Sequence, residues 1–228
     1  VEQLEALYQQ LLLWQRQCQQ PFWKRWFSAA PKPPKGLYFW GGVGRGKTYL
    51  VDTFFDSLPL DKKWRVHFHR FMHRVHQELK SLKHQSDPLE IIADRIAAQA
   101  NIICFDEFFV QDITDAMLLG KLFEYLFERK VVLVATSNIV PDDLYKNGLQ
   151  RERFLPAIRL IKENCRVVNV DSGVDYRLRT LSRAEIFHSP LDQQAEANLQ
   201  QYFSQLAPEK KDSYDATTID ILGREIEV

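Results

Sequence analysis

Cysteine is scarce in this chain, which contains three among its 228 residues. Cys18, Cys104 and Cys165 are odd in number and widely spaced, with no C-x-x-C pair and no secretory signal beside them. This pattern argues against a disulfide framework and indicates reduced thiols in a cytosol-like compartment. Long hydrophobic runs are missing as well, since none approaches the roughly 18 residues that a membrane-spanning helix needs. We therefore expect a cytoplasmic location.

The chain also lacks a net charge, because its 30 basic and 30 acidic residues cancel. Nothing in the overall balance steers the protein toward nucleic acid or an anionic membrane, so nucleic acid is an unlikely partner. A local basic surface is still possible. Residues 22–27, FWKRWF, would suit contact with a membrane surface or stacking on bases. We favour the alternative that these aromatic side chains pack over the core. A hydrophobic content of 45% indicates a substantial core, in one large domain or a domain with an appendage.

Glycine is rare too, with nine residues, but four of them fall within residues 41–48, GGVGRGKT. This segment fits the phosphate-loop pattern G-x-x-x-x-G-K-[ST], whose glycines leave room for a triphosphate held mainly by backbone N–H groups. The helix that starts near Gly46 adds its N-terminal N–H groups and positive dipole end. We expect Lys47 to reach the β- and γ-phosphates and the Thr48 hydroxyl to hold Mg²⁺. The predicted nucleotide-binding residues are Gly41, Gly42, Val43, Gly44, Arg45, Gly46, Lys47, Thr48 and Tyr49.

A second pattern is the apolar run at residues 102–105, which is followed by Asp106 and Glu107. A buried strand that ends in an acidic pair is typical of the Walker B arrangement, in which the aspartate orients Mg²⁺ and the glutamate polarises the attacking water. The carboxyl end of a strand in an open α/β sheet also faces the crevice where ligands bind. We therefore predict Asp106 and Thr48 as metal ligands and Glu107 as the base, which favours hydrolysis over binding alone.

Further polar residues follow the strand expected at 131–137. Asn138 offers a carboxamide beside the Walker B strand, where it would hold the same water or the γ-phosphate; a polar turn is the plain alternative. Arg151 and Arg153 precede the next helix, and arginine bridges charge that develops on a transferring phosphoryl group, either in cis or from a neighbour. Solvated surface arginines are equally common. The candidate catalytic residues are Glu107, Lys47, Asn138 and Arg153, with Arg151 as the alternative to Arg153.

Four histidines also cluster in the sequence, at His67, His69, His73 and His76. A strand would place the first two on one face, with the other two on the next helix. Zinc would suit such a cluster, but no cysteine or carboxylate completes a convincing spacing. We favour a structural or coupling role near the nucleotide crevice.

From residue 36 onward, short apolar segments alternate with helical patterns, which predicts a parallel sheet with helices on both faces. Strands are expected at 36–40, 64–69, 101–106, 131–137 and 166–170, with helices at 47–58, 71–84, 88–99, 112–130 and 155–163. Before the sheet, residues 1–20 form a helical pattern ended by Pro21 and followed by a proline-rich stretch. After residue 173 the pattern changes to a helix near 190–207 and a hairpin around Gly223.

The phosphate loop, the acidic pair, residues 136–138 and the arginine pair resemble, in this order, the core of an AAA+ ATPase, an α/β P-loop fold of strand order 5-1-4-3-2. Longer segments are similar to the ZapE-like family of AAA+ ATPases, which includes bacterial cell-division ATPases and mitochondrial relatives. These segments are HFHRFM, DPLEIIAD, CFDEFFVQDITDAMLL, LVATSN, NGLQRERFLPAI and VDYRLR, within residues 36–190.

The resemblance implies ATP and Mg²⁺ as cofactors, and ATP hydrolysis that remodels a protein partner. In bacteria the implied partner is a tubulin-like division protein, with peripheral contact at the inner membrane. It also implies a nucleotide-dependent homo-oligomer in which Arg153 faces the nucleotide of a neighbouring subunit. The chain would then divide into an N-terminal helix and linker (1–35), an ATPase core (36–173) and a C-terminal appendage (174–228) with a helix and a hairpin.

The sequence departs from the family at its end, where the expected C-terminal region is missing. Because the chain starts at Val1 and stops within a strand pattern, we expect a shortened protein. No sensor-2 arginine can be assigned, and Arg177 and Arg179 are weak candidates. Two alternatives stay open: an ATPase that loads or moves along nucleic acid, and a nucleotide-dependent scaffold with negligible turnover. The zero net charge argues against the first, and Glu107 argues against the second.

Overall fold

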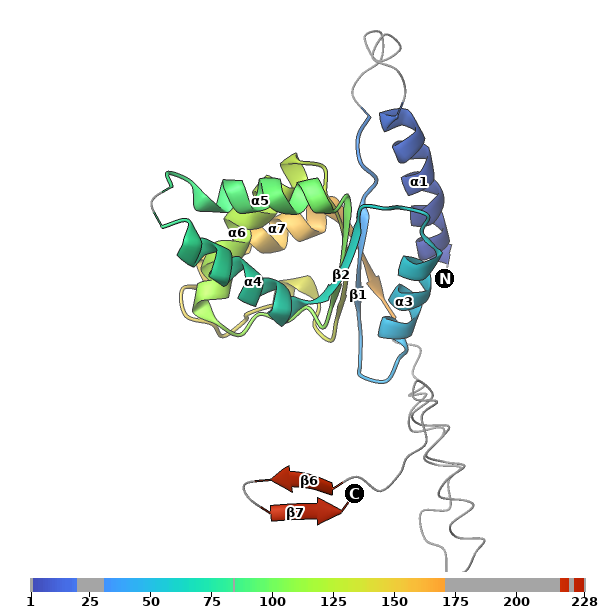
Figure 1. Ribbon diagram of the computed structural model, residues 1–228. Helices are drawn as coiled ribbons and strands as arrows, with labels where there is room; N and C mark the ends of the chain where they lie inside the picture. Colours follow the sequence, from blue (N-terminus) through green and yellow to red (C-terminus); the bar gives the residue numbers. More distant parts are fainter. Residues whose placement is uncertain (1, 20–30, 84, 171–217, 222–223, 228) are drawn as a thin grey trace, which may run out of the picture. The chain divides into compact units, whose positions relative to one another are not determined.

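A computed structural model describes residues 2–19, 31–83, 85–170, 218–221 and 224–227 (Figure 1). By their contacts, the residues form two compact units, Val1–Asp175 and Tyr176–Val228. In the second unit, β6 (Thr218–Ile221) pairs antiparallel with β7 (Arg224–Glu227), which confirms the expected hairpin. The helix expected near 190–207 lies outside the described residues, as do residues 22–27 and both weak sensor-2 candidates. The three-part division stays a prediction.

The first unit is built on a sheet of five parallel strands. They are β1 (Gly36–Trp40), β2 (Lys63–His67), β3 (Ile102–Asp106), β4 (Val132–Ser137) and β5 (Cys165–Asn169). Neighbouring strands follow the order β2-β3-β4-β1-β5, which is 5-1-4-3-2 when counted from the β5 edge. The expected α/β fold with this order is confirmed.

Helices cover both faces of the sheet. Figure 1 shows α1 and α3 on one face and α4, α5, α6 and α7 on the opposite face. Their bounds are α1 Glu2–Cys18, α3 Lys47–Ser57, α4 Phe68–Ser81, α5 Pro88–Gln99, α6 Ile113–Glu128 and α7 Leu155–Asn164, with short 3-10 turns η1 Pro141–Asp143 and η2 Arg151–Arg153. None of the helices in the described part of the chain combines the length and the apolar character that crossing a membrane requires.

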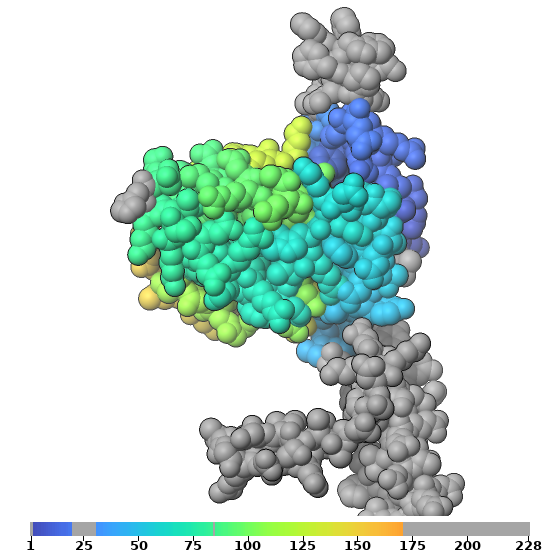
Figure 2. Space-filling view, in the orientation of Figure 1, coloured from blue at the N-terminus to red at the C-terminus, as the bar shows by residue number. Residues whose placement is uncertain are grey.

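Alternate residues of the central strands supply two separate cores, as the two-residue period of a strand dictates. In β1, Leu37 and Phe39 pack with α1 and α3, whereas Tyr38 packs with the helices of the opposite face. In Figure 2, side chains of α1 and α3 meet on the same side of the molecule. The N-terminal helix therefore belongs to the core of the first unit and is not a detached extension.

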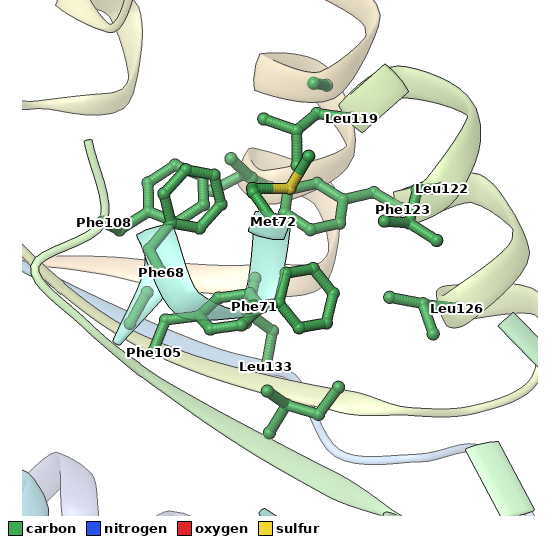
Figure 3. Packing of buried hydrophobic residues seen from close by; sticks show 14 of the residues in the cluster. Phe68, Phe71, Met72, Phe105, Phe108, Leu119, Leu122, Phe123, Leu126 and Leu133 are labelled. Carbon is green, nitrogen blue, oxygen red and sulfur yellow. The ribbon is translucent and has the colours of Figure 1, made fainter. Parts of the chain in front are cut away.

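Phenylalanine rings pack against one another in the larger core (Figure 3). The rings of Phe68 and Phe108 lie 4.5 Å apart, and those of Phe71 and Phe105 lie 4.7 Å apart. These contacts tie the start of α4 to the end of β3 and to the residue just after the acidic pair. Aromatic burial of this kind stabilises the segment that carries the candidate site.

The boundary between β2 and α4 differs from the expected one, and this changes where one of the histidines lies. The strand expected at 64–69 ends at His67, and α4 begins at Phe68, three residues before the expected start. Phe68, Phe71, Met72 and Val75 are all buried, and this spacing gives a helix one apolar face. His69 therefore lies in the first turn of α4, and the interpretation that it shares a strand face with His67 is wrong.

Candidate functional site

Three strand ends meet at one edge of the sheet. Because all strands are parallel, the loops that follow β1, β3 and β4 leave from the same side, and the pairing register aligns Trp40 with Ser137. Asp106 is the last residue of β3 and aligns with His67 at the end of β2. The predicted phosphate loop, acidic pair and Asn138 are thereby brought to a common edge.

The phosphate loop needs its glycines for their backbone conformation. Gly41, Gly44 and Gly46 have φ angles of 147°, 79° and 73°, a region that residues with a side chain rarely adopt. Gly46 caps α3, so the first backbone N–H groups of this helix have no side-chain partner at the cap and point out of its N-terminus. Such a loop before a helix can hold an anion.

The other loop side chains differ in exposure. A Cβ added to Gly42 would lie 3.4 Å from Arg45 Nε, which shows that the arginine side chain folds close to that backbone. Val43 and Tyr49 are exposed, with 56% and 73% of their surface accessible. Both have room to contact a nucleotide.

Lys47 connects the phosphate loop to the end of β4. Its Nζ donates hydrogen bonds to the carbonyl oxygens of Gly41 at 2.7 Å and Gly42 at 2.6 Å, and to Asn138 Oδ1 at 3.0 Å. Only 8% of the residue is exposed, so a positive charge is held inside the loop. A buried ammonium at this position favours the arrival of an anionic group.

Asp106 is buried and receives donors on both carboxylate oxygens. Oδ1 accepts from Thr48 Oγ1 at 3.0 Å and from Thr136 Oγ1 at 2.8 Å, while Oδ2 accepts from Arg65 Nη2 at 3.3 Å. The Arg65 guanidinium also pairs with Asp52 on α3. A buried carboxylate needs such partners, because an isolated one would be strongly disfavoured.

Glu107 has a different environment from its neighbour. It is exposed, and its φ of 52° is unusual for a residue other than glycine. Its backbone N–H donates to Thr136 Oγ1 at 3.2 Å, and the next N–H, from Phe108, donates to the carbonyl oxygen of Thr136 at 2.7 Å. The backbone of the acidic pair is therefore held against the end of β4.

A hollow of about 590 Å³ opens beside the acidic pair. Glu107 and Asn138 both line it, so the predicted base and the predicted carboxamide face the same space. The remaining walls come from the start of α4, the loop before α6, and the residues after β4: Phe68, His69, Phe108, Phe109, Gln111, Asp112, Asp115 and Ile139.

The two arginines on η2 differ in their contacts. Arg151 Nη2 donates to the backbone carbonyl of Asp142 at 2.5 Å, whereas Arg153 is exposed. Over the described ranges, the structure shows no side-chain hydrogen bond or ion pair for Arg153, and none joins either arginine to the phosphate loop or to the acidic pair. These two residues are the part of the predicted site that the structure does not bring together with the rest.

Oxygen ligands for a magnesium ion are present at the site. The Thr48 hydroxyl and the Asp106 carboxylate lie 3.0 Å apart, and oxygen is the donor that Mg²⁺ prefers. Within the part of the chain that is described, no three histidine, cysteine, aspartate or glutamate side chains group as a metal site. The residues fit Mg²⁺, and the histidines offer no zinc site there.

Buried thiols take no part in this chemistry. Burial raises the pKa of Cys104 in β3 to about 12, and it raises the pKa of Cys165 in β5 to about 12. Both thiols therefore stay protonated at neutral pH, and a protonated thiol is a poor nucleophile.

Sequence reasoning gave no role of their own to two contributors, Arg65 and Thr136, although Thr136 lies in the segment 136–138 that carries part of the resemblance. A signal exists for the first, since Arg65 lies in β2 two residues before its end, on the same strand face as His67. Thr136 lies in the segment that leads to Asn138, but a threonine in a strand is ordinary. Only the register of β3 beside β4 reveals its contact with Asp106.

Comparisons with solved structures return matches of low similarity. DnaI matches with a TM-score of 0.46 and 19% identity, over 62% of this chain and 72% of that one. AMPPCP-bound DnaA from Aquifex aeolicus matches with a TM-score of 0.48 and 13% identity, over 79% and 57%. The fold assignment rests on the strand order and phosphate loop described above, not on these scores.

The matches found by sequence have much higher identity than these structural matches. Cell division protein ZapE of Escherichia coli K12 is 59% identical over 192 residues, which cover 84% of this chain and 51% of ZapE. Lactation elevated protein 1 homolog B of Danio rerio is 42% identical over 211 residues, with 87% and 42% coverage. The chain thus spans about half the length of these relatives or less. The family model of AFG1-like ATPases matches residues 1–228, and the chain belongs to this family.

Proposed function

We propose that this chain is a Mg²⁺-dependent ATP hydrolase. The observation that supports this most directly is the hydrogen-bonded connection of Lys47 to Asn138 and of Thr48 to Asp106 at one sheet edge, with Glu107 beside it. Membership of the AFG1-like ATPase family supports the choice of nucleotide and of reaction.

Each residue has a separate role in the proposed mechanism. Backbone N–H groups of the loop and of the α3 N-terminus hold the phosphates, and Lys47 exchanges its carbonyl partners for phosphate oxygens. Thr48 and Asp106 hold Mg²⁺, which when bound polarises the phosphoryl oxygens and offsets developing charge. Glu107 polarises the attacking water, and Asn138 orients that water from the same hollow.

The basic test measures phosphate release and ATP binding by the wild-type chain with Mg²⁺ and with EDTA. Solution mass, measured in parallel with and without ATP and Mg²⁺, reports whether nucleotide drives assembly. Release of phosphate that needs Mg²⁺ supports the proposal. A chain that binds ATP tightly but releases no phosphate in any assembled state would instead support the scaffold alternative.

We further propose that hydrolysis acts on a protein partner in cell division, as the name of the E. coli relative suggests. The partner class we favour is a tubulin-like division protein, reached from the cytoplasm or from a peripheral position at the inner membrane. Sedimentation of polymers of such a protein, with this chain and ATP, tests the idea. The Glu107→Gln chain is the control, and equal polymer mass with both chains would contradict it.

Arg153 is proposed to act on the nucleotide of a neighbouring copy. Its exposed position without a side-chain partner among the described residues suits a group that reaches outside its own chain, whereas Arg151 is bonded to Asp142. An arginine supplied in trans contributes about 10³ to 10⁵ in rate where it has been measured. Arg153→Ala should therefore bind ATP normally and hydrolyse it very slowly.

An experiment with mixed variant chains distinguishes action of Arg153 on a neighbouring copy from action within its own chain. Arg153→Ala subunits mixed with Lys47→Ala subunits should recover some activity, because each supplies what the other lacks. No recovery in assemblies shown to contain both subunits would assign Arg153 a role within its own chain, or shift the role to Arg151.

A further inference from the structure

We propose that Thr136 is a positioning residue that sets both carboxylates of the acidic pair, an inference that rests on the proposed ATP hydrolysis. Thr136 lies in β4, only 2% exposed, and its side chain sits between Asp106 and the backbone of Glu107. Nothing in the phosphate-loop pattern or in the acidic pair itself points to this residue.

The direction of each hydrogen bond follows from the chemistry of the groups. A backbone N–H can only donate, so the Thr136 hydroxyl oxygen must accept from the Glu107 N–H at 3.2 Å. The single hydroxyl proton is then available for Asp106 Oδ1 at 2.8 Å. One hydroxyl therefore fixes the side chain of the metal ligand and the backbone of the base at the same time.

The backbone at Glu107 needs this support. A left-handed conformation is disfavoured for glutamate, and such conformations persist where surrounding contacts impose them. Two consecutive N–H groups, those of Glu107 and Phe108, bond to the hydroxyl and the carbonyl oxygen of Thr136. The Glu107 side chain has no hydrogen-bond or ion-pair partner among the described residues, so the backbone, through the Cα–Cβ direction, is what aims it toward the hollow.

The same hydroxyl also orients the metal-binding carboxylate. Thr136 and Thr48 both donate to Asp106 Oδ1, and this fixes which oxygen lies next to the second metal ligand. Valine would fill the same volume in a buried strand without the cost of a buried hydroxyl. The hydroxyl is thus explained by its two bonds rather than by packing.

Ser137, the next residue, offers a matched control. It is equally buried at 2% exposure, and its Oγ donates to the Phe108 carbonyl at 2.7 Å and accepts from the Ile139 N–H at 3.1 Å. It contacts neither Asp106 nor the Glu107 N–H. Ser137→Ala therefore removes a buried hydroxyl from the same strand end while it leaves both proposed bonds in place.

The experiment compares Thr136→Val, Thr136→Ser and Ser137→Ala. Three quantities are measured with a fluorescent ATP analogue and a phosphate-release assay: the ATP Kd in EDTA, the Mg²⁺ concentration that gives half of the Mg²⁺-dependent gain in binding, and kcat. Thr136→Val should raise the Mg²⁺ midpoint about tenfold and lower kcat roughly tenfold to a hundredfold, as loss of a hydrogen bond to a charged group predicts. The Kd in EDTA should stay within about twofold, because Asp106 affects ATP binding only through the metal, which EDTA removes.

The remaining variants decide the interpretation. Thr136→Ser should restore the midpoint and kcat to near the wild-type values, and Ser137→Ala should leave the midpoint unchanged. A wild-type midpoint and kcat in Thr136→Val, or an equal midpoint shift in Ser137→Ala, would overturn the proposal. Thermal melting in EDTA verifies folding, and Thr136→Ala carries the same test if the valine chain does not fold. Wild-type protein that binds no ATP would instead refute the proposed function.

Discussion

Substitution of Glu107 should lower the rate of ATP hydrolysis strongly while it changes the stability of the fold very little. The Glu107 side chain is exposed and has no partner among the described residues, so Glu107→Gln should change the free energy of unfolding by less than about 0.5 kcal/mol. Loss of a general base typically costs about 10² to 10⁴ in rate. At about 1.36 kcal/mol per tenfold, the barrier to hydrolysis rises by roughly 2.7 to 5.4 kcal/mol while ATP stays bound.

Glu107→Gly sharpens the same test because it also acts on the backbone. A left-handed non-glycine residue stores roughly 1 to 3 kcal/mol of strain. Glycine relieves that strain but costs roughly 0.5 to 1 kcal/mol in unfolded-chain entropy. With φ at 52°, the glycine variant should gain about 1 kcal/mol, which corresponds to a Tm increase of about 2 to 4 °C. It should hydrolyse ATP no faster than Glu107→Gln.

Both variants are assayed by phosphate release at saturating ATP, by ATP titration and by calorimetry without nucleotide. Glu128→Gln is a suitable control, since it makes the same change at an exposed carboxylate at the far end of α6. Wild-type turnover in Glu107→Gln would refute the assignment of the base. A glycine variant less stable than the glutamine variant would refute the strain argument.

Three further predictions concern the loop, the sheet and the partner class. Lys47→Ala should weaken ATP binding in a fluorescence titration by roughly tenfold to a hundredfold, because the phosphates lose a charged donor; wild-type affinity would remove Lys47 from the site. Gly36→Ala should destabilise the fold by more than about 3 kcal/mol in urea unfolding, since a Cβ there would lie 1.8 Å from the Leu133 carbonyl oxygen, and an unchanged urea midpoint would contradict that packing. Single-stranded oligonucleotide should leave the ATPase rate unchanged at about 150 mM salt, and stimulation there would favour the nucleic-acid alternative.

Sequence reasoning recovered the sheet because its signals are local. The apolar runs and the phosphate-loop glycines each act within a few residues of the element they define. The start of α4 was missed because HFH alternates like a strand, whereas burial of Phe68 against Phe108 selects the helix.

The site was only partly predictable for a related reason. Motif spacing identifies the residues next to the strand ends, including Lys47 and Asp106, but cross-strand contacts depend on register. Thr136 reaches Asp106 because β4 pairs with β3 in a register that brings these two residues together, and no local pattern encodes that register. The left-handed backbone of Glu107 likewise has no sequence signal, since glutamate is a poor choice for that conformation.

The strand order has a consequence for how the protein is made. β1 is synthesised before both of its neighbours in the sheet: Leu37 pairs with Val134, and Gly36 pairs with Cys165. Until those residues leave the ribosome, both edges of β1 carry unpaired backbone groups on a strongly apolar segment. The nascent chain is therefore exposed to misassembly until β4 and β5 have been made, and pauses in translation between β1 and β4 lengthen that exposure.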